Sequence, residues 1–175
     1  TAPTAGTLTM TTTDDGASSS DGIVGTLTPS FSLATASDTA YTGTNAPTAA
    51  IDSVVIQVSS DGGTTWTTKG TSASLSAPYT ATLAGLTSGT TYSIRALVTD
   101  TAGNTVTSAL STTSGKITVD TTAPTVGTLT MTTTDDGSSS SDGIIGTLTP
   151  AFSLASASDT SYTGTGAATA GIASV

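Results

Sequence analysis

The sequence contains no cysteine, no histidine and no glutamate among its 175 residues. Without these three residue types it has no Ser-His-Asp or Cys-His arrangement for nucleophilic catalysis, and zinc lacks its usual ligands. The absence of cysteine does not by itself place the chain in a compartment, because larger secreted modules fold without disulfides. We therefore expect a protein that is not an enzyme and has no catalytic residues.

Basic residues are almost as scarce. Lys69, Arg95 and Lys116 are the only ones, and the formal net charge is −9 at pH 7. A chain with so few cations cannot neutralise phosphates, which argues against nucleic acid as a partner, and it is repelled by an anionic membrane surface. No apolar run approaches the length of a transmembrane helix, so we expect no membrane insertion within this segment.

Aromatic residues make up only 4% of the chain, and a sustained apolar pattern of helical period is missing. Thr and Ser dominate instead, with 45 and 26 residues. Because threonine is β-branched, it fits a pleated surface and keeps strand propensity at solvent-facing positions. The composition indicates an all-β protein with a thin core.

A tandem repeat organises the chain. The opening Thr-Ala-Pro-Thr returns at residues 122–125, an offset of 121 residues (122 minus 1), and residues 1–54 match residues 122–175 at 44 of 54 positions. A unit of this length has the usual size of one domain. We expect residues 1–121 to form a complete module and residues 122–175 to form the first part of a second, near-identical module.

Alternating apolar and polar residues, separated by turn residues, predict short strands along the module. The clearest lie at residues 51–59 and 90–99, and Asp61-Gly62-Gly63 predicts a hairpin turn after the first of these. About seven or eight strands predict a β-sandwich of the immunoglobulin-like or fibronectin III-like kind. We expect its interior to hold Val54, Ile56, Trp66, Tyr92, Ile94 and Val98.

Residues 86–92, Leu-Thr-Ser-Gly-Thr-Thr-Tyr, lead directly into one of these strands. The pattern resembles the tyrosine corner of immunoglobulin-like sandwiches, in which the tyrosine hydroxyl bonds back to the preceding corner. The alternative is that Tyr92 is simply a buried tyrosine at the start of a strand.

Three motifs carry a wider resemblance. They are Ser-Asp-Gly-Gly-Thr-Thr-Trp at residues 60–66, Val-Thr-Asp-Thr-Ala-Gly-Asn at residues 98–104 and Val-Asp-Thr-Thr-Ala-Pro at residues 119–124. Their order within a repeat resembles the bacterial immunoglobulin-like tandem repeats of large extracellular adhesins and surface fibres, although residues 5–50 are longer and richer in Ser and Thr than expected for that family. The resemblance implies a structural module of an adhesin stalk or filament at the bacterial cell surface, with neighbouring repeats as partners.

The same resemblance implies calcium at or near module junctions, and the residue chemistry agrees. Calcium binds six to eight oxygen ligands from carboxylates, amide and backbone carbonyls and water. Asp100 and Asn104 share one turn and Asp120 ends the last strand, so we expect these three to meet at one pole of the sandwich. Further candidate ligands are the aspartates of two equivalent loops: Asp14, Asp15, Asp21, Asp135, Asp136 and Asp142.

The alternative for all these residues is that Asp and Asn only form turns and cap loops. Asp38 and Asp61 are expected to have that role.

Two matters remain open at this point. The rival function is a carbohydrate- or surface-binding sandwich module, which needs exposed aromatic residues; the candidates are Tyr41, which recurs as Tyr162, and Tyr79 and Trp66. The second copy also stops before its counterparts of Trp66 and Tyr92, so its core must be completed either by the continuing chain or by strands of another copy in a filament.

Overall fold

The computed structural model describes residues 1–12, 22–39, 41–42, 44, 50–111, 115–133, 143–159 and 162–163. These residues form strands and no helix, so the protein is all-β, and none of them belongs to a helix that could cross a membrane. The chain divides into two compact units, one made of Thr1–Thr121 with Ser161–Thr169 and the other of Thr122–Thr160 with Ala170–Val175.

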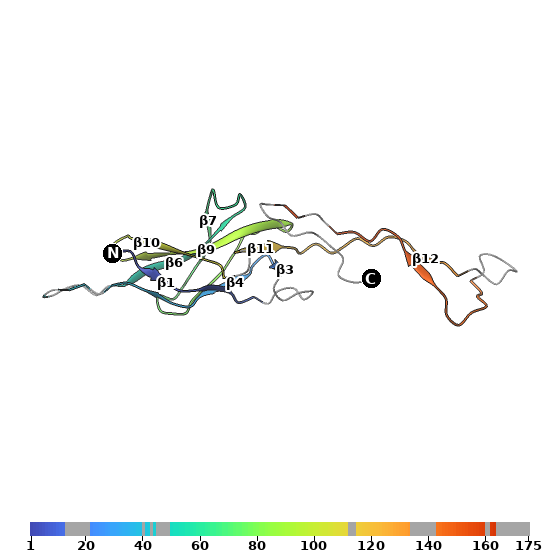
Figure 1. The fold of residues 1–175 in the computed structure, drawn as a ribbon, viewed down its shortest axis with the longest axis horizontal. Helices are drawn as coiled ribbons and strands as arrows, with labels where there is room; N and C mark the ends of the chain where they lie inside the picture. Colours follow the sequence, from blue (N-terminus) through green and yellow to red (C-terminus); the bar gives the residue numbers. More distant parts are fainter. Residues whose placement is uncertain are drawn as a thin grey trace. The chain divides into compact units, whose positions relative to one another are not determined.

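Two main sheets build the first unit (Figure 1). The larger has the order β3-β11-β9-β6-β7, and β10 also pairs with β9. Its strands are β3 (Ile23–Val24), β11 (Lys116–Val119), β9 (Thr90–Asp100), β6 (Ile51–Ser59), β7 (Thr67–Thr71) and β10 (Thr105–Ala109). The smaller has the order β2-β4-β8: Leu8–Met10, Ser30–Leu33 and Tyr79–Thr82. A separate pair joins β1, Thr4–Ala5, to β5, Ala36–Ser37.

Antiparallel pairing prevails in this unit, and only β11 and β3 pair in parallel among its named strands. The described part of residues 1–121 has eleven strands, more than the seven or eight that alternation predicts. The excess comes from β1, β3 and β5, because strands of two residues carry no alternation that a sequence can display.

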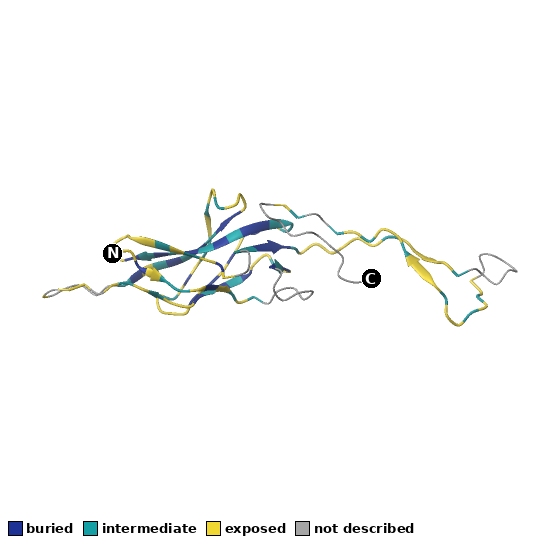
Figure 2. Cartoon of the chain, viewed as in Figure 1, coloured by how far each residue is buried: buried dark blue, intermediate teal, exposed yellow. Residues whose placement is uncertain are grey.

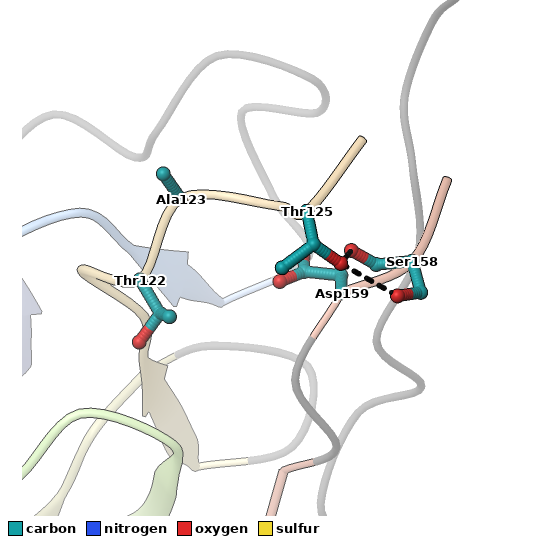
Figure 3. A pocket seen from close by; sticks show the side chains of 5 residues that line it. All are labelled: Thr122, Ala123, Thr125, Ser158 and Asp159. Atoms are coloured by element: carbon teal, nitrogen blue, oxygen red, sulfur yellow. Dashed lines mark hydrogen bonds between the residues drawn. The ribbon is translucent and has the colours of Figure 1, made fainter. Parts of the chain in front are cut away.

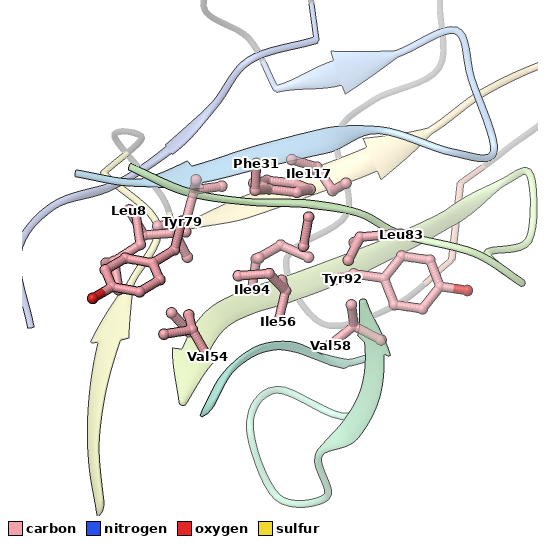
Figure 4. Packing of buried hydrophobic residues seen from close by; sticks show 14 of the residues in the cluster. Leu8, Phe31, Val54, Ile56, Val58, Tyr79, Leu83, Tyr92, Ile94 and Ile117 are labelled. Carbon is pink, nitrogen blue, oxygen red and sulfur yellow. The ribbon is translucent and has the colours of Figure 1, made fainter. Parts of the chain in front are cut away.

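Both main sheets contribute to one hydrophobic core, as the two layers of a β-sandwich do. Leu8 and Phe31 come from the smaller sheet and Ile56 and Ile94 from the larger (Figure 4). Tyr79 and Tyr92 lie at opposite sides of this cluster, with their rings against it and their hydroxyls pointing away. Full burial of each large aliphatic side chain contributes about 1.5–3 kcal/mol relative to exposure.

The predicted alternation in β6 and β9 is confirmed. The two strands lie side by side in antiparallel register, and Val54 is opposite Val98 while Ile56 is opposite Ala96. All four side chains are buried, whereas Gln57 lies between buried positions on the other face of the sheet. Buried and intermediate stretches alternate along the long strand β9 (Figure 2). The period of two residues therefore assigns one face of this sheet to the core.

Trp66 is the exception to the predicted interior. It precedes β7, is only partly buried and lies outside the core cluster. The guanidinium carbon of Arg95 is 4.0 Å from the centroid of the indole ring, and the indole N–H donates to the carbonyl of Gly63 at 2.9 Å. The prediction that Trp66 is in the core was wrong, because its ring folds back on its own hairpin turn and pairs with a cation on the outer face.

The hairpin turn itself forms as the sequence predicts. The carboxylate of Asp61 accepts the Ser59 hydroxyl at 2.6 Å and the backbone N–H groups of Thr64 and Thr65 at 3.0 and 2.9 Å. Gly63 has φ +96°, a conformation that side chains with a Cβ rarely adopt. Asp61 therefore acts as a turn residue.

Tyr92 makes the hydrogen bond that the corner motif predicts. Its hydroxyl accepts the backbone N–H of Thr87 at 3.2 Å, and its ring is buried. Gly89 supplies the positive φ, +76°, that the chain needs to turn from the corner into β9. The ring thus adds to the core while the hydroxyl fixes the corner.

The described strands of the second unit repeat the local structure of the first copy. β12, Leu129–Met131, pairs with β13, Phe152–Leu154, so that Leu129 is opposite Leu154 and Met131 is opposite Phe152. The equivalent pair β2 and β4 has the same register, in which Leu8 is opposite Leu33.

The two copies differ in how far their equivalent apolar side chains are buried. Leu8 and Phe31 are 0% exposed, whereas their counterparts Leu129 and Phe152 are 64% and 57% exposed. In the first unit these side chains belong to a core whose other members come mostly from residues 51–119, and the 175-residue sequence holds no second copy of that stretch. The local pairing therefore forms without the surface that buries it.

Candidate functional site

Asp100 and Asn104 form a closed turn between β9 and β10. Oδ1 of Asp100 accepts the backbone N–H groups of Ala102 and Asn104, both at 2.8 Å. Oδ2 accepts the side-chain amide of Asn104 at 2.9 Å. Both carboxylate oxygens thus bond within the turn, as the turn-forming alternative for these residues states.

These contacts explain the acidity of Asp100. The side-chain amide of Asn104 lowers the pKa of Asp100 most, and the backbone N–H groups of Asn104 and Ala102 lower it further. Burial opposes the shift, since the Asp100 side chain is almost wholly shielded from solvent. The net direction is downward, because hydrogen bonds to the charged form outweigh its desolvation.

The same turn lies beside the first residue of the module. The side-chain amide of Asn104 donates a second hydrogen bond, to the backbone carbonyl of Thr1, at 3.2 Å. The Asp100–Asn104 turn therefore marks the end of the module at which the repeat begins.

Asp120 lies at the other end of the module. It follows β11, in which Val119 is opposite Thr90, the first residue of β9, whereas Asp100 is the last residue of β9. A strand of eleven residues at about 3.3 Å per residue separates the two carboxylates by roughly 30 Å. The prediction that Asp100, Asn104 and Asp120 meet at one pole was wrong, because antiparallel pairing puts the end of β11 beside the start of β9.

The described residues do not bring Asp100, Asn104 and Asp120 together in one cluster. The described part of the chain contains no group of three or more His, Cys, Asp or Glu residues placed to hold a metal ion. The remaining candidates, Asp14, Asp15, Asp21, Asp135, Asp136 and Asp142, lie outside the described residues.

Asp120 has a partner of another kind. Its Oδ2 accepts the hydroxyl of Tyr162 at 2.9 Å, and Tyr162 belongs to the same compact unit. The next residue, Thr163, forms a parallel bridge with Thr90. Reasoning from the sequence missed this contact, although the recurrence of Tyr41 as Tyr162 was a signal for it.

A hollow of about 230 Å³ lies in the second unit, lined by Thr122, Ala123, Thr125, Ser158 and Asp159 (Figure 3). Thr125 Oγ1 lies 3.1 Å from the carbonyl oxygen of Ser158 and 2.7 Å from its hydroxyl. Thr4 and Ser37 repeat both contacts with the same distances in the first copy. The side chains that line the hollow are three with hydroxyl groups, one carboxylate and the methyl group of Ala123.

Asp38, the first-copy counterpart of Asp159, acts as the turn residue that the sequence predicts. Its Oδ1 accepts the backbone N–H of Thr39 at 2.7 Å. Its Oδ2 is buried and has no hydrogen-bond partner among the described residues.

The three aromatic candidates for a binding surface have different positions. Tyr79 is buried, and its hydroxyl lies 3.5 Å from the carbonyl oxygen of Ala36. Trp66 is covered by Arg95, whereas Tyr41 is 37% exposed. Of these three residues, Tyr41 is the most exposed, and Trp66 is partly buried.

Comparison with known proteins adds no relative. No family model matches the chain, and no curated protein matches it.

Proposed function

We propose that the chain is part of a structural stalk or surface filament built from tandem immunoglobulin-like sandwich modules, located outside the cell at a bacterial surface. The observation that carries the proposal is the near-identity of residues 1–54 and 122–175, at 44 of 54 positions. The shared core of two mainly antiparallel sheets and the tyrosine corner at Tyr92 support the immunoglobulin-like assignment.

The role of such a module is to add length to the stalk or filament. A sandwich with strands of about ten residues spans about 30–40 Å, so the length of an array grows with the number of copies. The linker suits this role, since Pro124 fixes its own φ and restricts Ala123. An acidic surface with a net charge of −9 keeps such a chain soluble and discourages its collapse on itself.

A length measurement tests the proposal. Proteins with residues 1–121 repeated two, three and four times should show a maximum dimension in small-angle scattering that grows by about 30–40 Å per copy. An antibody against residues 1–121 should label intact cells that express the protein. A maximum dimension that stays constant with copy number, or labelling only after lysis, would contradict the stalk.

Calcium remains part of the proposal in a changed form, with ligands drawn from two consecutive modules. Asn104 contacts Thr1, and Thr122 is the same residue of the next repeat, two positions after Asp120. In an array, the linker therefore has Asp120 of one module on one side and the Asp100–Asn104 turn of the next on the other. Extracellular calcium modules of this class bind at roughly 10⁻⁴ to 10⁻³ M.

A two-copy protein separates this from a metal-free junction. With residues 1–121 repeated twice, the maximum dimension from small-angle scattering should be larger in millimolar calcium than in EDTA. Asp120→Asn in the first copy should abolish this difference. Identical profiles in calcium and EDTA would remove calcium from the account and leave the stalk untouched.

The rival proposal is a glycan- or surface-binding module, and exposed Tyr41 is the observation that favours it. Glycan-array binding that is lost in Tyr41→Ala would support this function. Buried Tyr79 and covered Trp66 leave it little further aromatic surface among the candidates.

A further inference from the structure

Two residues of the second repeat complete the end of the first unit at which β9 begins. The backbone N–H of Thr163 donates to the carbonyl of Gly89 at 2.6 Å, and the backbone N–H of Thr91 donates to the carbonyl of Thr163 at 2.7 Å. The pairing of β6 with β9 stops at Ser59 opposite Ser93. Thr163 therefore bonds to Gly89, just before β9, and to Thr91 within β9, beyond the last residue of β9 that pairs with β6.

The adjacent Tyr162 adds a side-chain contact to these backbone bonds. Its hydroxyl donates to Oδ2 of Asp120 at 2.9 Å, and the ring is partly buried. A hydroxyl bonded to a carboxylate forms a charge-assisted hydrogen bond, which is roughly twice as strong as a neutral one. Asp120, Gly89 and Thr91 thus form a receptor for a Tyr-Thr dipeptide, with one acidic and several backbone groups.

The dipeptide recurs. Tyr41-Thr42 occupies in the first repeat the position that Tyr162-Thr163 occupies in the second, and both are followed by Gly-Thr. Tyr162 is partly buried against Asp120, whereas Tyr41 is 37% exposed. Tyr162 thus has the Asp120 end of a module beside it, whereas Tyr41 is among the exposed large side chains.

We infer that the Tyr-Thr dipeptide of every repeat docks on the Asp120 end of the preceding repeat, and that Tyr41-Thr42 is the corresponding docking element for another copy. The partner of this surface is a second copy of the same module, bound end to end. The exposed ring of Tyr41 is then an unoccupied half of an interface between repeats, and its role differs from that of a glycan contact.

We call the contact of Tyr162-Thr163 with Asp120, Gly89 and Thr91 the clasp. The clasp gives neighbouring repeats a second connection besides the linker. It needs no metal ion, because the Asp120 carboxylate accepts a hydrogen bond from a tyrosine hydroxyl. The inference rests on the tandem array that the proposed function shares, but it requires neither a surface location nor calcium. Its tests are therefore carried out in EDTA.

Hydrogen exchange of the full 175-residue chain tests the clasp. In the unmodified protein the amides of Thr91 and Thr163 should be protected. Tyr162→Ala should speed their exchange about tenfold, as expected for loss of one charge-assisted hydrogen bond, and should leave Val54 and Val98 in the core unchanged. Tyr162→Phe should reproduce most of this effect, because it removes only the hydroxyl.

Tyr41→Ala is the matched control, since it removes the same side chain from the other copy. It should leave the exchange of Thr91 and Thr163 unchanged. Exchange of Thr163 at the rate of a free peptide in the unmodified protein, or equal exchange of Thr91 in the unmodified protein and Tyr162→Ala, would overturn the clasp.

A second measurement tests the docking of Tyr41 on another copy. In Tyr162→Ala the Asp120 receptor is vacated, so Tyr41 of a second molecule can enter it. The amide shifts of Gly89 and Thr91 should then move with protein concentration up to the millimolar range, and this should stop in the Tyr41→Ala/Tyr162→Ala double variant. Amide shifts that do not change with protein concentration, or that change equally in Tyr162→Ala and in the double variant, would refute the docking role of Tyr41.

The outcomes also separate the clasp from the proposed function. Protection of Thr163 together with a constant scattering length would keep the clasp and remove the stalk. A length that grows with copy number, together with an unprotected Thr163, would do the reverse.

Discussion

Replacing Phe31 by alanine is expected to destabilise the first unit strongly, while the same change at Phe152 is expected to have little effect. The two residues occupy equivalent positions in the two copies, within the same Phe-Ser-Leu sequence and the same strand register. They differ in burial, because Phe31 is 0% exposed and Phe152 is 57% exposed. The pair therefore isolates the effect of the tertiary environment.

The magnitude follows from that environment. Truncation of a fully buried phenylalanine costs about 3–5 kcal/mol, from lost transfer free energy and the cavity that remains. A domain of this size has a free energy of unfolding of about 5–15 kcal/mol, so the Phe31→Ala variant should still fold. Truncation of the largely exposed Phe152 should change the free energy of unfolding by about 0.5 kcal/mol or less.

Urea unfolding monitored by tryptophan fluorescence measures the difference, because Trp66 is the only tryptophan and lies in the first unit. With a slope of about 2 kcal/mol/M, Phe31→Ala should lower the midpoint by roughly 1.5–2.5 M. The Phe152→Ala midpoint should coincide with that of the unmodified protein.

An equal shift in both variants would refute this reasoning in an informative way. Since the strand pairs β2–β4 and β12–β13 share sequence and register, the second pair could replace the first against residues 51–119. A Phe152→Ala shift of the full size, with none for Phe31→Ala, would mean that the β12–β13 pair of the second copy occupies the core.

Three further predictions concern single contacts in the first unit. Tyr92→Phe removes the acceptor for the Thr87 N–H and should lower the free energy of unfolding by about 1 kcal/mol, read from the urea midpoint; an unchanged midpoint would show that the corner bond adds nothing. Hydrogen bonds lower the pKa of Asp100 in the folded state, so its stabilising effect is fully present above its unfolded value of about 3.9 and is lost as pH falls through the folded pKa. Asp100→Asn should therefore lower stability at pH 7 and flatten its decline below about pH 4, which acid titration of the urea midpoint checks. Arg95→Ala should shift the emission maximum of Trp66 while changing stability by only about 0.5–1 kcal/mol; unchanged emission would place the guanidinium away from the ring.

Much of the first unit could be predicted from the sequence. The alternation of Val54, Ile56 and Val58 assigns one face of β6 to the core, and Tyr92 after Leu-Thr-Ser-Gly gives the corner contact. These features depend on residues close together in the chain. An alternation of period two, or a turn, can be recognised without knowing which other segments of the chain pack against it.

The wrong predictions concern residues whose positions depend on distant parts of the chain. Trp66 is apolar enough for a core, but the geometry of its own turn places it beside Arg95 on the outer face. Asp100 ends β9 and Asp120 follows β11, yet only the pairing of β9 with β11 shows that they lie at opposite ends. Strand direction in a sheet is a property of the assembled chain, and no spacing in the sequence expresses it.

The sequence by itself determined the local structure of the repeat: Leu129 and Leu154 pair in the second copy as Leu8 and Leu33 do in the first. Tertiary structure alone decided that Leu8 is buried while Leu129 is exposed to solvent. The reason is that strand pairing is satisfied by backbone groups of neighbouring segments, whereas burial needs an apolar surface supplied by distant residues, here 51–119.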